Sequence, residues 1–290
     1  MSASGTEATV FDARRCALGE GALWHPERRA LFWFDILGKR LLWRDEAGRS
    51  GEWPWEEHVS AAGWVDRERL VVASETALWS FSLADGRRER LCPLEADLPR
   101  NRSNDGRADP WGGFWIGTMG KAAEPGAGAI WRWYRGELRR LFGGLTITNA
   151  IAFDPLRPEA TFADTRARRV MRVPLDPATG WPSGPARPWL DLGAEELNPD
   201  GAVFDAEGGL WVALWGAGRV QRFLPDGRAA EAVAVPASQA SCPAFGGADQ
   251  GTLFVTSAAV GAPRGERAAG LTFRAPAPVA GRPEPRVILP

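Results

Sequence analysis

The sequence predicts an all-β protein folded as a six-bladed β-propeller, with four antiparallel strands in each blade and the ring closed by an N-terminal strand. Three observations support this prediction. Fifteen tryptophans lie in short apolar runs, and 34 glycines and 23 prolines are dispersed between those runs. A pattern of a turn followed by an apolar strand recurs at a spacing of roughly 40 to 50 residues, which is the length of a four-stranded blade. No amphipathic segment of three or more turns indicates a long helix.

Each copy of the repeat begins with a turn built on Asp, Pro or Gly and continues with a strand rich in Trp, Phe, Leu and Val. The turns begin near residues 25, 65, 109, 154, 205 and 248. Most copies continue with a further strand and a hairpin turn containing Asp or Gly, as at residues 84–86 and 225–227. Six copies predict six blades.

The segment at residues 8–11 precedes the first copy. We expect it to supply the outer strand of the last blade, because this closes the ring and removes an exposed sheet edge. A two-domain all-β protein is the alternative, and it explains the regular spacing less well. Residues 1–290 are therefore expected to form a single domain.

Composition and charge exclude several classes of protein. Apolar residues make up 44% and charged residues 24%, so the chain is not disordered. The formal net charge of -1 provides no basic field for nucleic acid or an anionic membrane. The first seven residues lack the features of a secretory signal, no apolar run is long enough to span a membrane, and we expect a cytoplasmic protein. Three cysteines are too few and too far apart for a disulfide framework or a thiolate zinc site.

Alignment of the strand before each turn identifies a candidate site. In four of the six copies a carboxylate or carboxamide lies five residues before the His or Asp of the turn, namely at Glu20, Asn104, Asn149 and Asp200. Equivalent positions in a ring point to one place, so we expect these side chains to converge at the mouth of the central channel. Their oxygens suit a hard divalent cation, and without one the two carboxylates would repel each other. The alternative is that they only satisfy backbone groups around a water-filled pore.

Other candidate residues fit catalysis less well. His25 occupies a turn position that holds Asp in other copies, which favours a role in the turn. No Gly-x-Ser-x-Gly motif is present to support a Ser-His-Asp triad, and Cys242 fits a buried thiol. No EF-hand spacing and no phosphate-binding Gly-Lys-Ser/Thr loop occurs.

The end of the second strand of each copy should reach the same mouth. This adds a group of residues at equivalent positions: Asp35, Glu75, Met119 to Lys121, Asp164 and Trp215. The link at residues 120–128 is rich in glycine and longer than its counterparts in other copies. It is either a lid over the site or a simple insertion.

Five motifs along the chain resemble those of the SMP-30/gluconolactonase/luciferin-regenerating-enzyme-like family, to which regucalcin and the bacterial sugar lactonases belong. They lie at residues 18–24, 101–106, 117–119, 147–149 and 198–201, and the similarity runs from about residue 16 to about residue 255. The resemblance implies a six-bladed propeller that binds one divalent metal ion through Glu20, Asn149 and Asp200. It also implies that Arg102 and Asn104 contact the substrate.

The sequence departs from the family in two places. The segment after Gly-Thr-Met carries adjacent glutamates in regucalcin and reads Gly120, Lys121 and Ala122 here. The Gly-Pro that usually follows the first metal ligand is Gly21 and Ala22 here. Lys121 is nevertheless a candidate substrate contact.

The leading hypothesis is a divalent-metal-dependent hydrolase that opens sugar-derived lactones of the aldonolactone type. Ca²⁺ is the first choice of cation, with Zn²⁺, Mn²⁺ and Fe²⁺ as alternatives, and Asp200, or a water held by it, is the candidate general base. The expected partner is a small-molecule sugar lactone, and a monomer is compatible with the sequence. The alternative hypotheses are a metal-dependent esterase or organophosphate hydrolase at the same site, and a non-catalytic calcium-binding protein.

Overall fold

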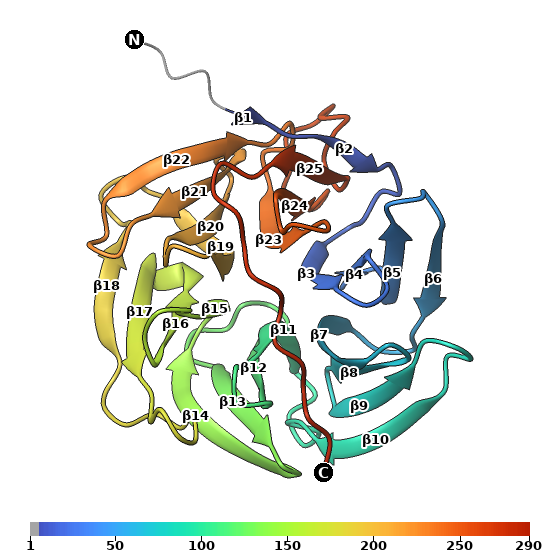
Figure 1. The fold of residues 1–290 in the computed structure, drawn as a ribbon. Coiled ribbons are helices and arrows are strands. Elements are labelled where there is room, and N and C mark those ends of the chain that lie inside the picture. Colours follow the sequence, from blue (N-terminus) through green and yellow to red (C-terminus); the bar gives the residue numbers. More distant parts are fainter. Residues whose placement is uncertain (1–5) are drawn as a thin grey trace.

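The computed structural model describes residues 6–290 as six four-stranded antiparallel blades arranged in a ring (Figure 1). The predicted six-bladed propeller is confirmed. Residues 1–5, which form most of the segment on which the expectation of no secretory signal rests, lie outside the described residues. Within residues 6–290 no helix is long and apolar enough to cross a membrane.

Each of the first three blades consists of four consecutive strands, ordered from the channel outward. Blade 1 comprises β3 (Gly19–His25), β4 (Ala30–Asp35), β5 (Arg40–Asp45) and β6 (Ser50–Pro54). Blade 2 comprises β7 (Val59–Asp66), β8 (Arg69–Ser74), β9 (Ala77–Ser82) and β10 (Arg88–Pro93). Blade 3 comprises β11 (Asn101–Ala108), β12 (Phe114–Gly120), β13 (Gly128–Tyr134) and β14 (Glu137–Leu145).

The last three blades follow the same order, except that the outer strand of blade 6 comes from the N-terminus. Blade 4 comprises β15 (Thr148–Phe153), β16 (Glu159–Asp164), the 3₁₀ turn η1 (Thr165–Ala167), β17 (Arg169–Pro174) and β18 (Arg187–Asp191). Blade 5 comprises β19 (Asn198–Phe204), β20 (Leu210–Trp215), β21 (Arg219–Phe223) and β22 (Ala229–Ala234). Blade 6 comprises β23 (Ala240–Gly246), β24 (Thr252–Ser257), β25 (Thr272–Pro276) and β2 (Thr9–Asp12).

The N-terminal segment closes the ring as predicted. Strand β2 pairs antiparallel with β25, with Val10 opposite Phe273. The short strand β1 (Thr6–Glu7) also pairs in parallel with β22, so that blade 5 has a fifth strand that the sequence did not predict. Strands β1 and β2 therefore join two neighbouring blades.

The tryptophan-rich runs form the interfaces between and within the blades. Trp33, Trp115 and Trp211 occupy the second strands of alternate blades and are fully buried. Strand β6, at the outer edge of blade 1, alternates between exposed and half-buried residues instead. Large aromatic side chains bury much apolar surface each, which accounts for their concentration in the inner strands.

The aspartates of the repeated turns fix the hairpins between the first and second strands. One oxygen of Asp109 accepts hydrogen bonds from the amides of Trp111 and Gly113, and the other accepts one from Arg132 Nε at 2.7 Å. Asp205 makes the same pair of amide contacts in blade 5. His25 takes this place in blade 1, where its Nδ1 accepts a hydrogen bond from the Arg28 amide of the turn at 3.4 Å and its Nε2 contacts the Asp66 carbonyl of blade 2 at 3.0 Å, in agreement with the predicted turn role.

The C-terminal segment, residues 277–290, runs across one face of the ring (Figure 1). The amides of Val287 and Ile288 donate to the carbonyls of Trp64 and Gly112, at 2.7 and 2.9 Å. Glu284 forms a buried ion pair with Arg107. This segment showed little pattern in the sequence, yet it covers this end of the channel with both backbone and charged contacts.

Candidate functional site

A cavity of about 610 Å³ lies at the channel mouth, and all four of the predicted oxygen-bearing residues line it. Glu20, Asn104, Asn149 and Asp200 come from the innermost strands of blades 1, 3, 4 and 5. No residue of the C-terminal segment lines this cavity. The convergence expected from the repeat is therefore present in the fold.

A second cavity, of about 410 Å³, lies beside the C-terminal segment and is lined largely by prolines and apolar side chains. Its most buried cation, Arg107, is already paired with Glu284. Of these two cavities, the first is the one into which the four predicted oxygen-bearing side chains converge.

A β-bulge in each innermost strand directs the polar side chains into the channel. The pairing register shifts just after Glu20 in β3 and just after Asn149 in β15, and corresponding shifts occur in the other four blades. The residues that follow, Gly21 and Ala150, have φ values of 58° and 51°. A bulge turns the strand locally and re-aims a side chain, so this irregularity places the ligand-bearing residues. Glycine is needed at position 21, because a Cβ there would overlap the Ser60 carbonyl oxygen.

A chain of hydrogen bonds orients the two amide side chains. Asn104 Nδ2 donates to Asn149 Oδ1 at 3.0 Å and to the Thr148 carbonyl at 2.8 Å. Asn149 Nδ2 in turn donates to Thr165 Oγ1 at 2.8 Å. Since both donor groups are engaged, Asn149 Oδ1 keeps its remaining lone pair as an acceptor with a defined direction.

The two carboxylates of the site are buried and oppose each other. Glu20 is 6% exposed and Asp200 is 4% exposed. Burial, together with the charge of Asp105, raises the pKa of Glu20 to about 8. Burial and the charge of Glu20 raise the pKa of Asp200 well above its usual range. The positive charge of Arg102 opposes these two effects but does not outweigh them, and a bound cation would relieve the remaining repulsion.

The donor set is made of oxygen alone. Among the described residues no group of three or more His, Cys, Asp or Glu side chains is placed to hold a metal ion. The site instead offers two carboxylates, Glu20 and Asp200, and the oriented amide oxygen of Asn149. Such oxygens match the preference of hard divalent cations.

Arg102 lies two residues before Asn104 in β11, and both line the cavity. Its Nη1 donates to Asn104 Oδ1 at 2.7 Å and to the Ser103 carbonyl at 2.8 Å. Within residues 6–290 it forms no ion pair with a carboxylate. Burial lowers the pKa of Arg102 to about 10.

The residues expected at the ends of the second strands divide into two groups. Met119 and Trp215 line the cavity. Asp35 and Asp164 do not, because their carboxylates accept hydrogen bonds from backbone amides of neighbouring loops at 2.9 to 3.1 Å. These two aspartates hold the loops around the mouth instead of facing the cavity.

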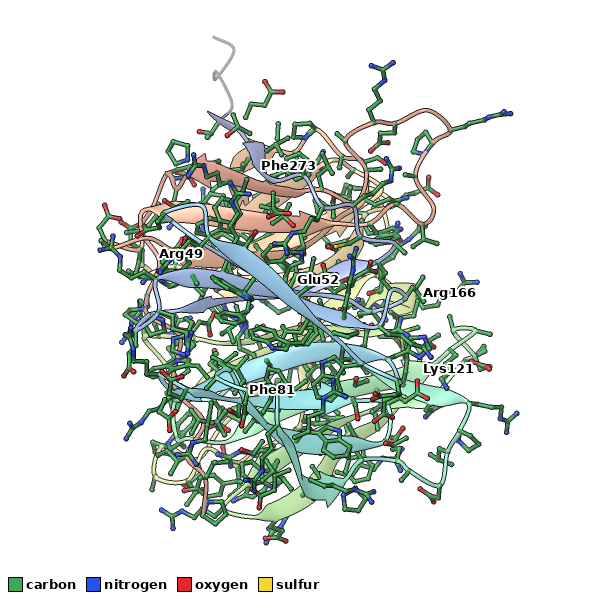
Figure 2. All side chains as sticks on the ribbon, turned by 90° about the vertical axis from the view of Figure 1, so that its right-hand side faces the viewer. Arg49, Glu52, Phe81, Lys121, Arg166 and Phe273 are labelled. Atoms are coloured by element: carbon green, nitrogen blue, oxygen red, sulfur yellow. The ribbon has the colours of Figure 1, made fainter. Side chains whose placement is uncertain are left out.

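Lys121 lies on the same side of the molecule as Arg166, a cavity residue (Figure 2). Its Nζ contacts Glu75 Oε1 at 3.1 Å and the Pro99 carbonyl at 2.9 Å, and Glu75 also contacts His58 Nδ1. Neither Lys121 nor the rest of residues 121–128 lines the cavity. Lys121 is therefore held beside the mouth by a carboxylate, and its role as a substrate contact stays a prediction.

Part of the cavity wall was not predicted from the sequence. Thr165, Arg166 and Arg168, in and just after η1, line it together with Asn198. The alignment stopped at Asp164, one residue before this turn. The sequence Thr-Arg-Ala-Arg at residues 165–168 could have indicated these residues. It directly follows the second strand of its copy, and the ends of the second strands reach the mouth of the channel.

The family model described as the SMP-30/Gluconolactonase/LRE-like region matches residues 18–259. The chain belongs to this family. An L-arabinolactonase of Azospirillum brasilense is 38% identical, with 88% of this chain and 85% of that protein covered. A 6-deoxy-6-sulfogluconolactonase of Pseudomonas putida is 32% identical, with 83% of each chain covered. A crystal structure of a calcium-binding protein, regucalcin, from Agrobacterium tumefaciens is 39% identical, covers 97% of each chain, and superposes with a TM-score of 0.94.

The bulge beside Glu20 gives a first prediction. We expect Gly21→Ala to lower the free energy of unfolding by more than the roughly 1–2 kcal/mol that a left-handed conformation costs, because the added Cβ also overlaps the Ser60 carbonyl. Gly144→Ala is the matched control, since Gly144 has φ of 74° and open space around its Cβ position. Urea unfolding of both variants checks this. Equal losses in the two would contradict the close approach at Gly21.

Proposed function

We propose that this protein hydrolyses sugar-derived lactones of the aldonolactone type and uses one divalent cation held by Glu20, Asn149 and Asp200. The observation that carries the proposal is the pair of opposed, buried carboxylates beside an oriented amide oxygen, all facing one cavity of about 610 Å³. The relatives named as lactonases support the choice of substrate, and the neighbour named as a calcium-binding protein supports Ca²⁺ as the cation. Zn²⁺, Mn²⁺ and Fe²⁺ are the alternative ions.

The residues of the site fit such a cation. Glu20 and Asp200 together carry the two negative charges that neutralise it, and the amide oxygen of Asn149 adds a neutral ligand. When bound, the cation would act as a Lewis acid that polarises the lactone carbonyl, an effect worth several kcal/mol.

The surrounding side chains bind the substrate and transfer the proton. Arg102 and Asn104 hold the ring hydroxyls by hydrogen bonds, and Met119 and Trp215 supply an apolar surface for the ring. Hydrolysis adds a water oxygen to the carbonyl carbon and breaks the bond from that carbon to the ring oxygen. Asp200, or a water held by it, accepts the proton of the attacking water, and that proton is returned to the departing ring oxygen.

A panel of 1,4- and 1,5-aldonolactones tests the proposal directly. We expect turnover above the spontaneous rate, loss of that turnover after chelation, and recovery on addition of a divalent cation. Acid release measured with a pH indicator follows each substrate. Metal binding without turnover on any lactone would support a non-catalytic calcium-binding protein instead, and a preference for aryl esters or organophosphates would support another hydrolase at the same site.

Asp200→Ala tests the ligand assignment. We expect it to abolish tight cation binding and turnover, because it removes one of the two charges that face the ion. The midpoint of unfolding should stay close to that of the unmodified protein, since the side chain lies at the end of a strand and not in a blade core. Calorimetric cation titration, thermal unfolding and the lactone assay are compared with Asp249→Ala, a change in an exposed turn of blade 6. An Asp200→Ala protein with full metal-restored activity would overturn the assignment.

Arg102→Ala separates substrate binding from metal binding. The loss of a charged hydrogen bond costs about 1.5–3 kcal/mol, so we expect kcat/KM to fall by roughly one to two orders of magnitude. Cation affinity should change little, because Arg102 contacts Asn104 and not the proposed ligands. Steady-state kinetics and calorimetry on the same variant check both points. Unchanged catalysis together with altered metal binding would remove Arg102 from the substrate site.

A further inference from the structure

We infer that the lactone taken by this site carries a second, anionic group, such as a terminal carboxylate, which is recognised by three arginines of the cavity wall. These residues, Arg102, Arg166 and Arg168, are called the arginine wall below. The inference rests on the proposed function, because it names the substrate class of the same site. A neutral aldonolactone needs hydrogen-bond partners for its hydroxyls but no cluster of cations.

The outer part of the arginine wall is poorly neutralised by the protein. Arg168 Nε donates to the neutral Asn198 Oδ1 at 3.2 Å, and its carboxylate neighbour Glu196 lies at 3.8 Å and is 82% exposed. Such an exposed, long ion pair contributes little. Arg166 lines the cavity, is exposed, extends outward from the molecule (Figure 2), and forms no ion pair in the described part of the chain. Two guanidinium groups are thus available at the rim of blade 4.

Arg102, the buried member of the arginine wall, is also poorly neutralised by the protein, but for a different reason. Arg102 is buried, and only its Nη1 donates to protein acceptors within residues 6–290. The negative charges that favour its charged form are those of Glu20, Asp200 and Glu75. Glu75 is already in contact with Lys121 and His58, and the other two are the proposed cation ligands. A cation in that position would leave the Arg102 charge without a counterion from the protein.

The charge count of the cavity lining points in the same direction. Three arginines face two carboxyl groups, so the lining is positive by one formal charge even when both carboxyl groups are ionised. A divalent cation at Glu20 and Asp200 would increase this excess. Planar guanidinium groups bind carboxylate, phosphate and sulfonate oxygens through paired, charge-assisted hydrogen bonds. An anionic group on the substrate would supply the negative charge that balances the arginines of the lining.

A matched pair of lactones isolates this group. D-Glucono-1,4-lactone and D-glucaro-1,4-lactone have the same ring and differ by a terminal hydroxymethyl or carboxylate, and 6-phosphogluconolactone adds a phosphate arm. We expect kcat/KM to be at least about tenfold higher for an anionic lactone, a preference that shrinks at high ionic strength because salt screens the arginine charges. The carboxylate and phosphate arms identify which anion the wall prefers.

Single variants locate the effect. We expect Arg166→Gln and Arg168→Gln each to lower kcat/KM for the anionic lactone by roughly three- to tenfold, with less than about twofold change for the neutral lactone. Arg90→Gln, in the outer strand of blade 2, is the control, since Arg90 is also exposed but lies in β10 and does not line the cavity. As a readout independent of turnover, calorimetry should show tighter binding of D-glucarate than of D-gluconate, and the two wall variants should lose that difference.

The outcomes distinguish this inference from the proposed function. Equal or better turnover of the neutral lactone, with no effect of the wall variants, would overturn the inference and leave the lactonase proposal standing. Turnover of none of the lactones would overturn the lactonase proposal itself. In that case a preference for D-glucarate in the calorimeter would still support an anion site at the arginine wall.

Discussion

The candidate site depends on closure of the ring. Glu20 belongs to blade 1 and Asp200 to blade 5, and the two carboxylates face one cavity only because blade 6 bridges the blades that carry them. That bridge is itself completed by strand β2 from the other end of the chain, paired with β25. Residues far apart in sequence are therefore held at one point by backbone pairing at the perimeter. An open ring would separate the ligands without changing any local structure around them.

Closure of the ring also brings several buried charged side chains together along the channel. They form a lower layer toward the C-terminal segment and an upper layer at the cavity. Below the opposed carboxylates lies Asp105, whose pKa is raised to about 6 by burial even though Arg107 lowers it. Asp105 accepts a hydrogen bond from the Ile151 amide at 2.8 Å, and Arg107 pairs with Glu284 of the C-terminal segment. Each buried charge in this lower layer has a partner. At Glu20 and Asp200, by contrast, burial and mutual repulsion outweigh the favourable charge of Arg102, and the proposed cation site lies between these two carboxylates.

The features that could be predicted from the sequence are those that the repeat encodes. The blade number follows from the six turns, and the convergence of Glu20, Asn104, Asn149 and Asp200 follows because equivalent positions in a ring share one environment. Other features have no periodic signal. The ion pair of Arg107 with Glu284 and the strand β1 depend on where non-repeating ends of the chain fall in space. The bulges after the ligand residues could not be predicted either. Ala150, in one of them, adopts a left-handed backbone conformation that is uncommon for alanine, so its residue type does not indicate a bulge.

Arg166 and Arg168 lie at the rim of the cavity, whereas Glu20 and Asp200 are buried within it, and this distribution of charge bears on the proposed reaction cycle. Opening a lactone at neutral pH creates a carboxylate, so the ligand gains one negative charge during turnover. Beside Glu20 and Asp200 that charge is unfavourable unless a cation lies between them, whereas beside Arg102 it is favourable. A site with Arg102 beside the buried carboxylates and with Arg166 and Arg168 at its rim would therefore stabilise the product toward the mouth, the direction in which it must leave. The same gradient that would select an anionic substrate would guide the newly charged product away from the carboxylates, and it arises from the placement of β11 and η1 on adjacent blades of the closed ring.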